Sequence, residues 1–208
     1  GYASLEDANR IAVLLRSGSL PVKVEKVFSQ TVGPTLGADS LAKSTKAGIV
    51  GVAAILIFMI LYYRLPGLLA NFTLAVYVMI VMGVFAALGA TLTLPGIAGF
   101  LLSIGIAVDA NIIIYERLKE ELRSGNSLRR SVEAGFSRAF TTIFDSNATT
   151  MIAAVILYYF GTGPIRGFAI TLIIGILASI FTAVVITRYL LRLLVDSKIA
   201  TDKKWYGV

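Results

Sequence analysis

The sequence contains no cysteine and no histidine. Without cysteine the chain cannot form a disulfide, and without either residue it cannot build a Cys/His zinc site. The absence of histidine also excludes a Ser-His-Asp or a Cys-His catalytic site within this chain.

Charged residues are scarce as well. Asp, Glu, Lys and Arg together make up 15% of the chain, whereas hydrophobic residues make up 57%. Average soluble domains are ~25% charged and ~45–50% apolar. The composition therefore argues against a water-soluble domain. It argues equally against a disordered chain, which needs low hydrophobicity and high charge.

Five apolar stretches are long enough to be membrane-spanning helices: residues 47–63, 68–92, 97–115, 143–160 and 168–191. A helix needs about 20 residues to cross ~30 Å of hydrocarbon. We therefore predict an all-α membrane protein whose helix bundle occupies residues 41–195. An outer segment, residues 1–40, precedes the bundle, and a short, charged and mobile tail, residues 196–208, follows it.

The positive charges indicate the orientation of the bundle. If the N-terminal segment faces outward, the inner loops and the tail hold 12 of the 19 Lys and Arg residues, and the short outer loops hold only Arg166. Basic residues gather on the cytoplasmic side of membrane proteins, so we expect a cytoplasmic C-terminus. The net charge of +7 then reflects topology and attraction to anionic membrane lipid, not nucleic-acid binding.

Residues 1–40 have the composition of a soluble segment. Ser4 is a candidate cap for a short helix that ends at Gly18, and residues 21–25 alternate like a strand. One helix and one strand cannot bury a core alone. The segment is therefore interpreted as the end of a larger α+β domain outside the membrane. The chain itself is interpreted as a fragment, since it has neither an initiator Met nor a signal peptide.

A polar stretch separates the third and fourth spans. Residues 116–123 are expected to extend the third helix into the cytoplasm, and Gly125-Asn126 is a turn signal. Ser127 can cap a second helix, which we predict to be amphipathic and to lie at the inner membrane surface within the connector 116–142. An ordinary solvated connector is the alternative.

Acidic side chains inside the spans are the informative residues, because such groups are costly in hydrocarbon unless paired, protonated or hydrated. Asp109 lies deep in the third span, and Glu116 returns to the same helix face about 10 Å further on. Asp145 lies near the inner end of the fourth span, one turn from Thr149. With no Lys or Arg deep in any span, Asp109 must be protonated, face water or pair with another chain. The alternative is a buried acid hydrogen-bonded to a neighbouring helix.

Small residues form two candidate packing rows. The third span carries the row Gly99, Ser103 and Ala107, and Gly105, a further candidate packing residue, lies one turn before Asp109 on the same face. The fifth span carries a stripe that includes Gly175 and Ser179. Such residues allow helices to approach closely. The stripe on the fifth span is interpreted as a packing seam or as the wall of a hydrated cavity.

The residues around Asp109 resemble a known family. Residues 105–111, with the sequence GIAVDAN, and the following YER at 115–117 are similar to the signature helix of the SecD/SecF protein-export membrane proteins, which belong to the resistance–nodulation–division superfamily. Residues 14–21, 32–37 and 161–169 resemble the same family. The resemblance covers essentially the whole chain.

This resemblance implies a six-helix bundle of which the chain supplies helices two to six. It also implies a transport protein of the bacterial inner membrane, not an enzyme, with no cofactor and no metal. The expected partners are SecF, the SecYEG channel, possibly YajC, and the unfolded polypeptide in transit.

The resemblance further implies that proton flow drives movement of the outer domain. Asp109 would belong to the proton path, supported by Asn111, Glu116 and Arg117. A second set, Asp145, Asn147 and Thr149, matches polar positions of the following helix. The ionic partner of Asp109 is expected in SecF.

Four alternatives stay open. The chain could belong to a small-solute exporter of the same superfamily, or to a purely structural membrane subunit. An intramembrane aspartyl protease would need two Asp residues sharing a proton, and the Gly-x-Gly-Asp motif of that family surrounds neither Asp109 nor Asp145. Sodium could also replace the proton as the coupling ion.

Overall fold

The computed structural model describes residues 5–16, 34–91, 93–197 and 203–206, and every element in these ranges is helical. The chain divides into two compact units, residues 1–37 and 38–208. The first unit contains α1 (Leu5–Arg16), which confirms the helix predicted after Ser4. Gly18 and the strand predicted at residues 21–25 lie outside the described residues.

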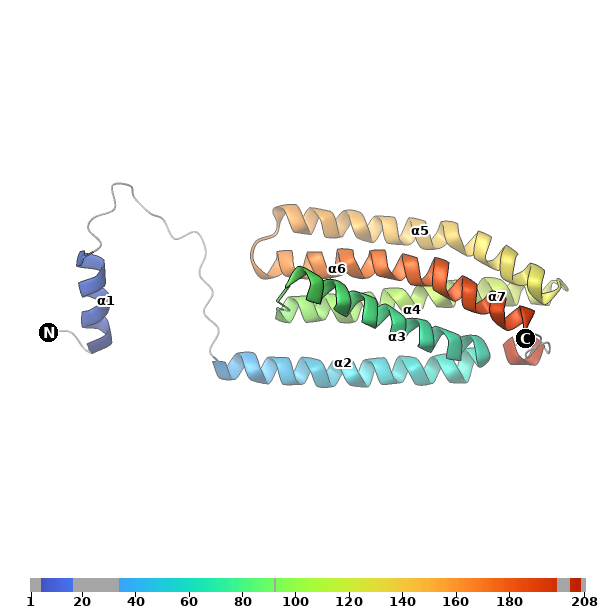
Figure 1. Ribbon diagram of the computed structural model, residues 1–208, viewed down its shortest axis with the longest axis horizontal. Helices are drawn as coiled ribbons and strands as arrows, with labels where there is room; N and C mark the ends of the chain where they lie inside the picture. Colours follow the sequence, from blue (N-terminus) through green and yellow to red (C-terminus); the bar gives the residue numbers. More distant parts are fainter. Residues whose placement is uncertain (1–4, 17–33, 92, 198–202, 207–208) are drawn as a thin grey trace. The chain divides into compact units, whose positions relative to one another are not determined.

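Five long helical segments confirm the predicted all-α membrane class (Figure 1). They are α2 (Pro34–Tyr63), α3 (Leu65–Leu88), α4 (Leu94–Arg123), α5 (Leu128–Phe160) and a last span. The last span runs from α6 (Pro164–Phe181) through a π-helical segment (Thr182–Thr187) into α7 (Arg188–Asp196). All five are long and apolar enough to cross a membrane. Several exceed the predicted ranges, because polar residues at their ends continue the helix beyond the apolar stretch.

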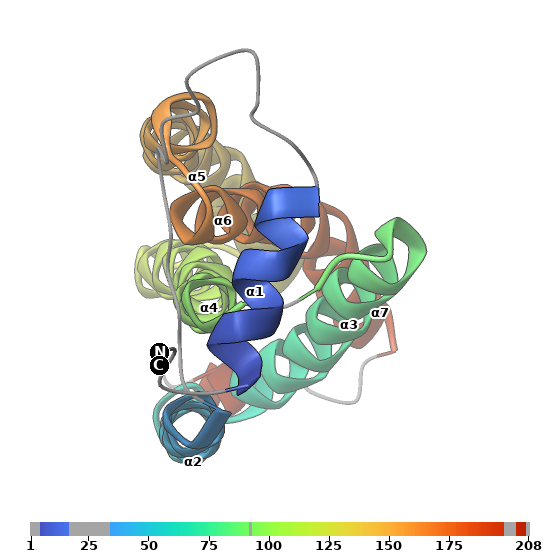
Figure 2. The same ribbon diagram turned by 90° about the vertical axis from the view of Figure 1, so that its left-hand side faces the viewer.

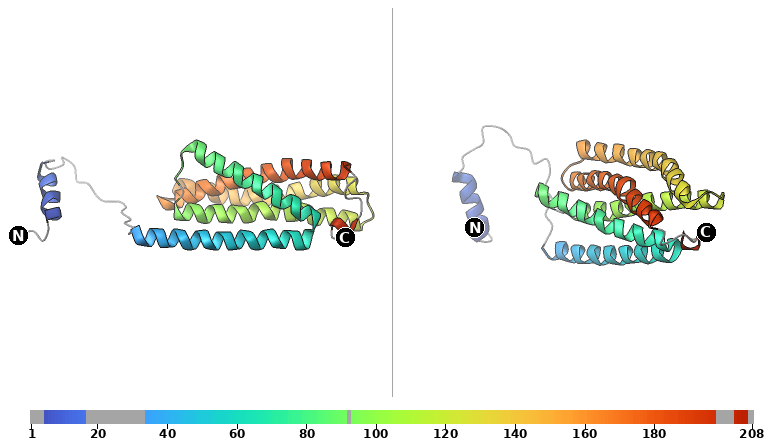
Figure 3. Two further views of the ribbon diagram at one scale, coloured as in Figure 1. Left: turned by 60° about the horizontal axis from the view of Figure 1, so that its bottom comes forward. Right: turned by 45° about the vertical axis from the view of Figure 1, so that its right-hand side comes forward.

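Helix α4 is the centre of the bundle. It packs along α6 and α5, which also contact each other, while α3 crosses beside the last span (Figures 2 and 3). The largest fully buried side chains include Tyr77, Tyr115 and Ile176. Helix α2 contributes mainly its C-terminal end, where Met59 and Tyr63 are buried.

The connection between α2 and α3 is a tight turn. Arg64 has a positive φ of 54°, an unusual conformation for a residue with a side chain. A Cβ on Gly67 would overlap the backbone oxygen of Met59, so only glycine fits the close approach there. The Asn71 side chain then donates to the backbone oxygen of Leu56 at 3.1 Å and holds α3 against α2.

The helix predicted after Ser127 is present, but the prediction that it is an element separate from the fourth span is wrong. Helix α5 runs without interruption from Leu128 to Phe160. Its first turns pack on α4 through the buried small residues Ser131, Gly135 and Ala139, and a Cβ on Gly135 would stand 3.1 Å from the Leu118 nitrogen. This close contact keeps the segment in the bundle. Ser127 occupies the N-cap position, but its side chain makes no capping hydrogen bond.

Within the described part of the tail, residues 203–206 differ from the prediction of a mobile segment. Residues Lys203–Tyr206 form a short 3₁₀ helix that contacts α3, and the Tyr206 side chain is 1% exposed within the core. Burial raises the pKa of Tyr206 to about 12. The phenol is therefore neutral at physiological pH, as a buried hydroxyl should be.

Candidate functional site

Asp109 lies on a face of α4 that the bundle leaves uncovered. Ala98, Leu102, Gly105 and Asp109 are exposed at alternating spacings of four and three residues, which places them on one stripe, here called the open face. Asp109 is ~22 Å along the axis from Leu94, so it lies within the hydrocarbon depth of a spanning helix. Within the described ranges its carboxylate makes no hydrogen bond and no ion pair.

The surroundings of the open face make a lone carboxylate unfavourable. Its other members are apolar or small, and Leu102 is 50% exposed. An ionised carboxylate facing lipid at this depth costs about 3 kcal/mol or more. Asp109 must therefore be protonated, reached by water, or met by a polar group of another chain.

A second polar group lies on the same helix towards the turn between α4 and α5. The Lys119 side chain is only 5% exposed, and its Nζ is 3.4 Å from Glu116 Oε1. The ammonium also lies 4.3 Å and 4.5 Å from the ring centroids of Tyr62 and Tyr63. Two aromatic faces and one carboxylate thus compensate a buried positive charge.

Tyr63 connects this group with Asp109. Its phenol lies close enough to interact with the Glu116 carboxylate, and it is within electrostatic range of Asp109. Asp109, Tyr63, Glu116 and Lys119 therefore form a row of polar groups from the middle of α4 towards one end of the bundle. Sequence reasoning missed Tyr63 and Lys119. The spacing of three residues between Glu116 and Lys119 was the available signal, but the sequence does not show that the Lys119 side chain is buried.

Asn111 belongs to a different environment. Its side chain is 3% exposed, and its Nδ2 donates to the backbone oxygen of Ala107 at 3.1 Å. The Thr187 hydroxyl, in the π-helical segment, donates to Asn111 Oδ1 at 2.8 Å and lies 3.3 Å from Thr73 Oγ1. Thr73, Asn111 and Thr187, here the buried polar triad, tie α3, α4 and the last span together. The structure does not bring Asn111 into contact with Asp109.

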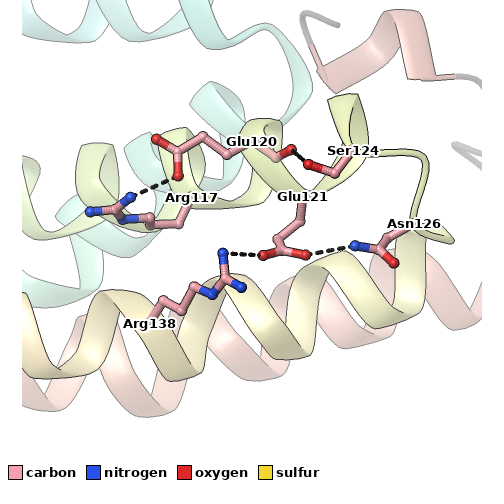
Figure 4. A network of polar contacts seen from close by, with 6 residues as sticks. All are labelled: Arg117, Glu120, Glu121, Ser124, Asn126 and Arg138. Carbon is pink, nitrogen blue, oxygen red and sulfur yellow. Dashed lines mark hydrogen bonds and ion pairs between the residues drawn. The ribbon is translucent and has the colours of Figure 1, made fainter.

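Arg117 faces a neighbouring acid and not the interior. Its Nη1 is 2.7 Å from Glu120 Oε2, and both side chains are about half exposed. The buried acid at this end is Glu121, which binds Arg138 of α5 and Asn126, each at 2.7 Å (Figure 4). These contacts fix the turn between α4 and α5.

The polar residues of α5 are placed separately. Asp145 and Thr149 are exposed, and the Thr149 hydroxyl donates to the Asp145 backbone oxygen at 3.1 Å. Asn147 is 4% exposed, and its Nδ2 donates to the Ile143 backbone oxygen at 2.8 Å. Among the described residues, Asn147 Oδ1 has no partner. In the part of the chain that the structure describes, no hydrogen bond or ion pair joins the Asp145 carboxylate to Asp109.

The predicted packing residues fall into two groups. A Cβ on Gly175 would overlap Ser103, and a Cβ on Gly99 would stand 3.0 Å from the Phe168 backbone oxygen, so both glycines lie where α4 and α6 approach closely. Ser103 and Ser179 are fully buried, and Ser103 Oγ accepts from the Tyr77 hydroxyl at 2.6 Å. Gly105 departs from the prediction, since it lies on the open face with no atom near its Cβ position.

A family model matches most of the chain. Residues 16–197 match the family described as protein export membrane protein SecD/SecF, C-terminal. The chain is 54% identical over 207 residues to the protein translocase subunit SecD of Acidaminococcus fermentans, a match that covers 100% of this chain and 50% of that protein. It is 50% identical over 209 residues to the protein translocase subunit SecDF of Bacillus subtilis, with coverage of 100% and 28%. The chain thus spans half or less of these relatives.

Solved structures match as well. The crystal structure of SecDF from Thermus thermophilus, described as a translocon-associated membrane protein, superposes with a TM-score of 0.81 at 44% identity, covering 95% of this chain and 28% of that one. A structure of SecDF in the super-membrane-facing form gives a TM-score of 0.76, also at 44% identity, with coverage of 95% and 27%.

Proposed function

The chain belongs to the SecD/SecF family of protein-export membrane proteins, and from this premise we propose that it is the membrane part of a subunit that couples proton movement to protein export. The proposed cargo is an unfolded polypeptide that leaves through the SecYEG channel. Asp109 carries the proton in this proposal. Its position on the open face of α4 is the observation on which the proposal rests.

The open face suits a second membrane subunit. In a membrane, the stripe around Asp109 is covered by lipid or by protein, and only protein can offer the carboxylate a fixed polar partner. We propose that SecF covers this face and supplies a cation opposite Asp109. The relative from Bacillus subtilis is named SecDF, which supports a close association of the two halves. SecYEG, and possibly YajC, are proposed as further partners.

The row from Asp109 to Lys119 suits proton movement in stages. Tyr63 and Glu116 lie between the open face and the end of the bundle that carries the turn between α4 and α5. We propose that this end faces the cytoplasm and that residues 1–40 lie outside the bacterial inner membrane. The row then connects Asp109 to the cytoplasm.

The available energy is sufficient for such a device. One charge that crosses 100 mV provides about 2.3 kcal/mol. Fully coupled, this free energy shifts a two-state equilibrium ~50-fold. Proton entry at Asp109 could therefore change the preferred arrangement of the bundle and of the domain attached to it.

The test is Asp109→Asn in the full-length subunit together with its partners. Export of a secretory precursor is measured in membrane vesicles with and without an imposed proton gradient. We expect the variant to insert normally and to lose the stimulation by the gradient, because the amide cannot exchange a proton in this range. Asp196→Asn, an exposed acid at the end of α7, is the matched control and should keep the stimulation.

Two further arms separate the alternatives. Replacing sodium with potassium should leave gradient-driven export unchanged, since the proposal requires only protons. A dye-efflux assay on the same vesicles should show no transport by this subunit. Unchanged gradient-dependent export by Asp109→Asn would refute the proposed role of Asp109.

A further inference from the structure

A cavity of about 290 Å³ opens between α4, α5 and the last span. None of its lining residues belongs to the row formed by Asp109, Tyr63, Glu116 and Lys119. Its apolar lining comes from Ile114, Phe136, Phe140, Ile143 and Val184. Two polar residues, Ser137 and Arg188, complete the lining. The cavity therefore combines a hydrophobic wall with one permanent positive charge.

Arg188 is incompletely satisfied at this position. Its Nε is shielded from solvent and has no hydrogen-bond partner among the described residues. The guanidinium carbon lies 6.0 Å from the centroid of the Phe136 ring. A shielded donor left without an acceptor costs about 1–3 kcal/mol, and more when it is charged. An acceptor supplied by a ligand would remove this cost.

The depth of Arg188 identifies the kind of acceptor. Arg188 is 24 residues after Pro164, the start of the last span, which corresponds to ~36 Å along the helix axis. The hydrocarbon core is ~30 Å thick, so a span that enters it near Pro164 places Arg188 at the level of the lipid headgroups. A guanidinium at this level is suited to binding a phosphate through its planar set of donors.

The apolar wall continues out of the cavity along α5. Phe140 and Phe144 are 47% and 55% exposed. Their rings stack with a centroid distance of 6.2 Å, which is within the range of offset aromatic pairs. An acyl chain can lie along these rings while its headgroup stays at Arg188.

The charge of the surroundings selects among lipids. The first turns of α5 carry Arg129 and Arg130 against a single acid, Glu133, while the charge of Arg138 is balanced by Glu121. This excess favours a headgroup with net negative charge over one that adds a cation of its own. Basic pockets between membrane helices bind anionic lipids for the same reason.

We propose that this cavity is a binding site for one anionic phospholipid. Its phosphate accepts from Arg188 and Ser137, and an acyl chain lies along Phe140 and Phe144. The site goes beyond the proposed export function and does not depend on Asp109. It would make the packing of α5 against the last span sensitive to the anionic lipid content of the membrane.

The test uses the delipidated full-length subunit in detergent and native mass spectrometry. Phosphatidylglycerol and phosphatidylcholine with identical acyl chains are added separately. We expect one tightly retained phosphatidylglycerol and weaker retention of phosphatidylcholine. Arg188→Gln should lower phosphatidylglycerol retention about 10-fold, the effect of losing a charge-assisted hydrogen bond. Arg192→Gln, an exposed cation one turn away that pairs with Glu133 at 3.6 Å, is the matched control and should change little.

A second variant guards against misfolding of Arg188→Gln. Ser137→Phe fills the cavity from an exposed position and keeps the charge of Arg188. It should also lose the bound lipid while its thermal unfolding matches that of the parent. Retention of phosphatidylglycerol by either Arg188→Gln or Ser137→Phe would overturn the proposal. Equal loss in Arg192→Gln would also overturn it, because it would show only general attraction to the basic surface.

Other occupants are distinguished by competition. Inorganic phosphate should not displace the lipid, and displacement by it would assign Arg188 to a free anion instead. The cavity can also be probed through Ser137→Cys, because the chain has no cysteine of its own. Protection of this thiol should follow added phosphatidylglycerol. Protection that requires the partner subunit and occurs without lipid would assign the cavity to a protein contact and overturn the proposal.

Discussion

Asp109 and Asn111 show how much two residues can differ within one helix turn. Successive residues of an α-helix are rotated by about 100°, so these two side chains point to nearly opposite sides of α4. One lies on the open face, and the other is 3% exposed in the buried polar triad. The sequence indicates this separation in angle. It does not indicate which side is covered, because that depends on where α3 and the last span pack.

The buried polar triad provides a prediction at the residue scale. Thr187→Val keeps the shape of the side chain but removes the donor to Asn111 Oδ1. An acceptor shielded from water then loses its partner, and we expect the free energy of unfolding to fall by about 1 kcal/mol. Unfolding in mixed micelles at increasing denaturing detergent would measure the loss.

Two variants make this prediction specific. Thr187→Ser keeps the hydroxyl and should be closer to the parent than Thr187→Val. Thr150→Val removes a hydroxyl that donates only to the Ser146 backbone oxygen of its own helix, at 3.1 Å, and should have a smaller effect. Equal destabilisation by Thr150→Val and Thr187→Val would show that the triad has no special role in holding the helices together.

At the scale of elements, the contact between α4 and α6 depends on the absence of a side chain at Gly175. A Cβ at this position would overlap Ser103 and stand 2.9 Å from the Tyr77 hydroxyl. We expect Gly175→Ala to push α4 and α6 apart and to lower stability by about 1–3 kcal/mol. The midpoint of thermal unfolding in detergent would report the change.

The matched control is a glycine of α3 that has open space around it. Gly83 has no atom within 4 Å of its Cβ position, so Gly83→Ala should be neutral or stabilising by up to about 1 kcal/mol. Ser103→Gly, combined with Gly175→Ala, should recover part of the loss, because it removes the atoms that clash. No recovery, together with equal effects of the two alanine variants, would contradict close packing at Gly175.

The elements also show which features a sequence can predict. The end of α2 at Tyr63 and the turn at Gly125-Asn126 follow from local signals, namely a change from apolar to polar residues and a Gly-Asn pair. The π-helical segment Thr182–Thr187 gives no such signal, because its residues continue the apolar run of α6 without a break. A π-helix has a wider turn than an α-helix, with hydrogen bonds between residues five apart. We attribute this wider turn to packing, because Thr187 of this segment donates a hydrogen bond to Asn111 of α4.

At the scale of the whole molecule, the arrangement of spans was predictable and the burial of charges was not. Apolar length alone indicates five crossings, and the structure has five such segments. The burial of Lys119 between Tyr62, Tyr63 and Glu116 requires the end of α2 to return to α4. Such a contact between distant segments leaves no pattern in the sequence around Lys119. The same reason hides the docking of Tyr206 onto the bundle.

The orientation of the bundle can be tested with single cysteines, because the chain contains none. Ser127, before α5, and Thr162, after it, are exposed, and the 33 residues of α5 separate them by ~50 Å along the axis. If the basic turn between α4 and α5 is cytoplasmic, as the charge distribution predicts, a membrane-impermeant maleimide added to intact cells should label Thr162→Cys and leave Ser127→Cys unlabelled. Both should react after the membrane is permeabilised, which controls for burial. Labelling of Ser127→Cys alone in intact cells would reverse the orientation, and the row from Asp109 to Lys119 would then lead to the outside of the cell.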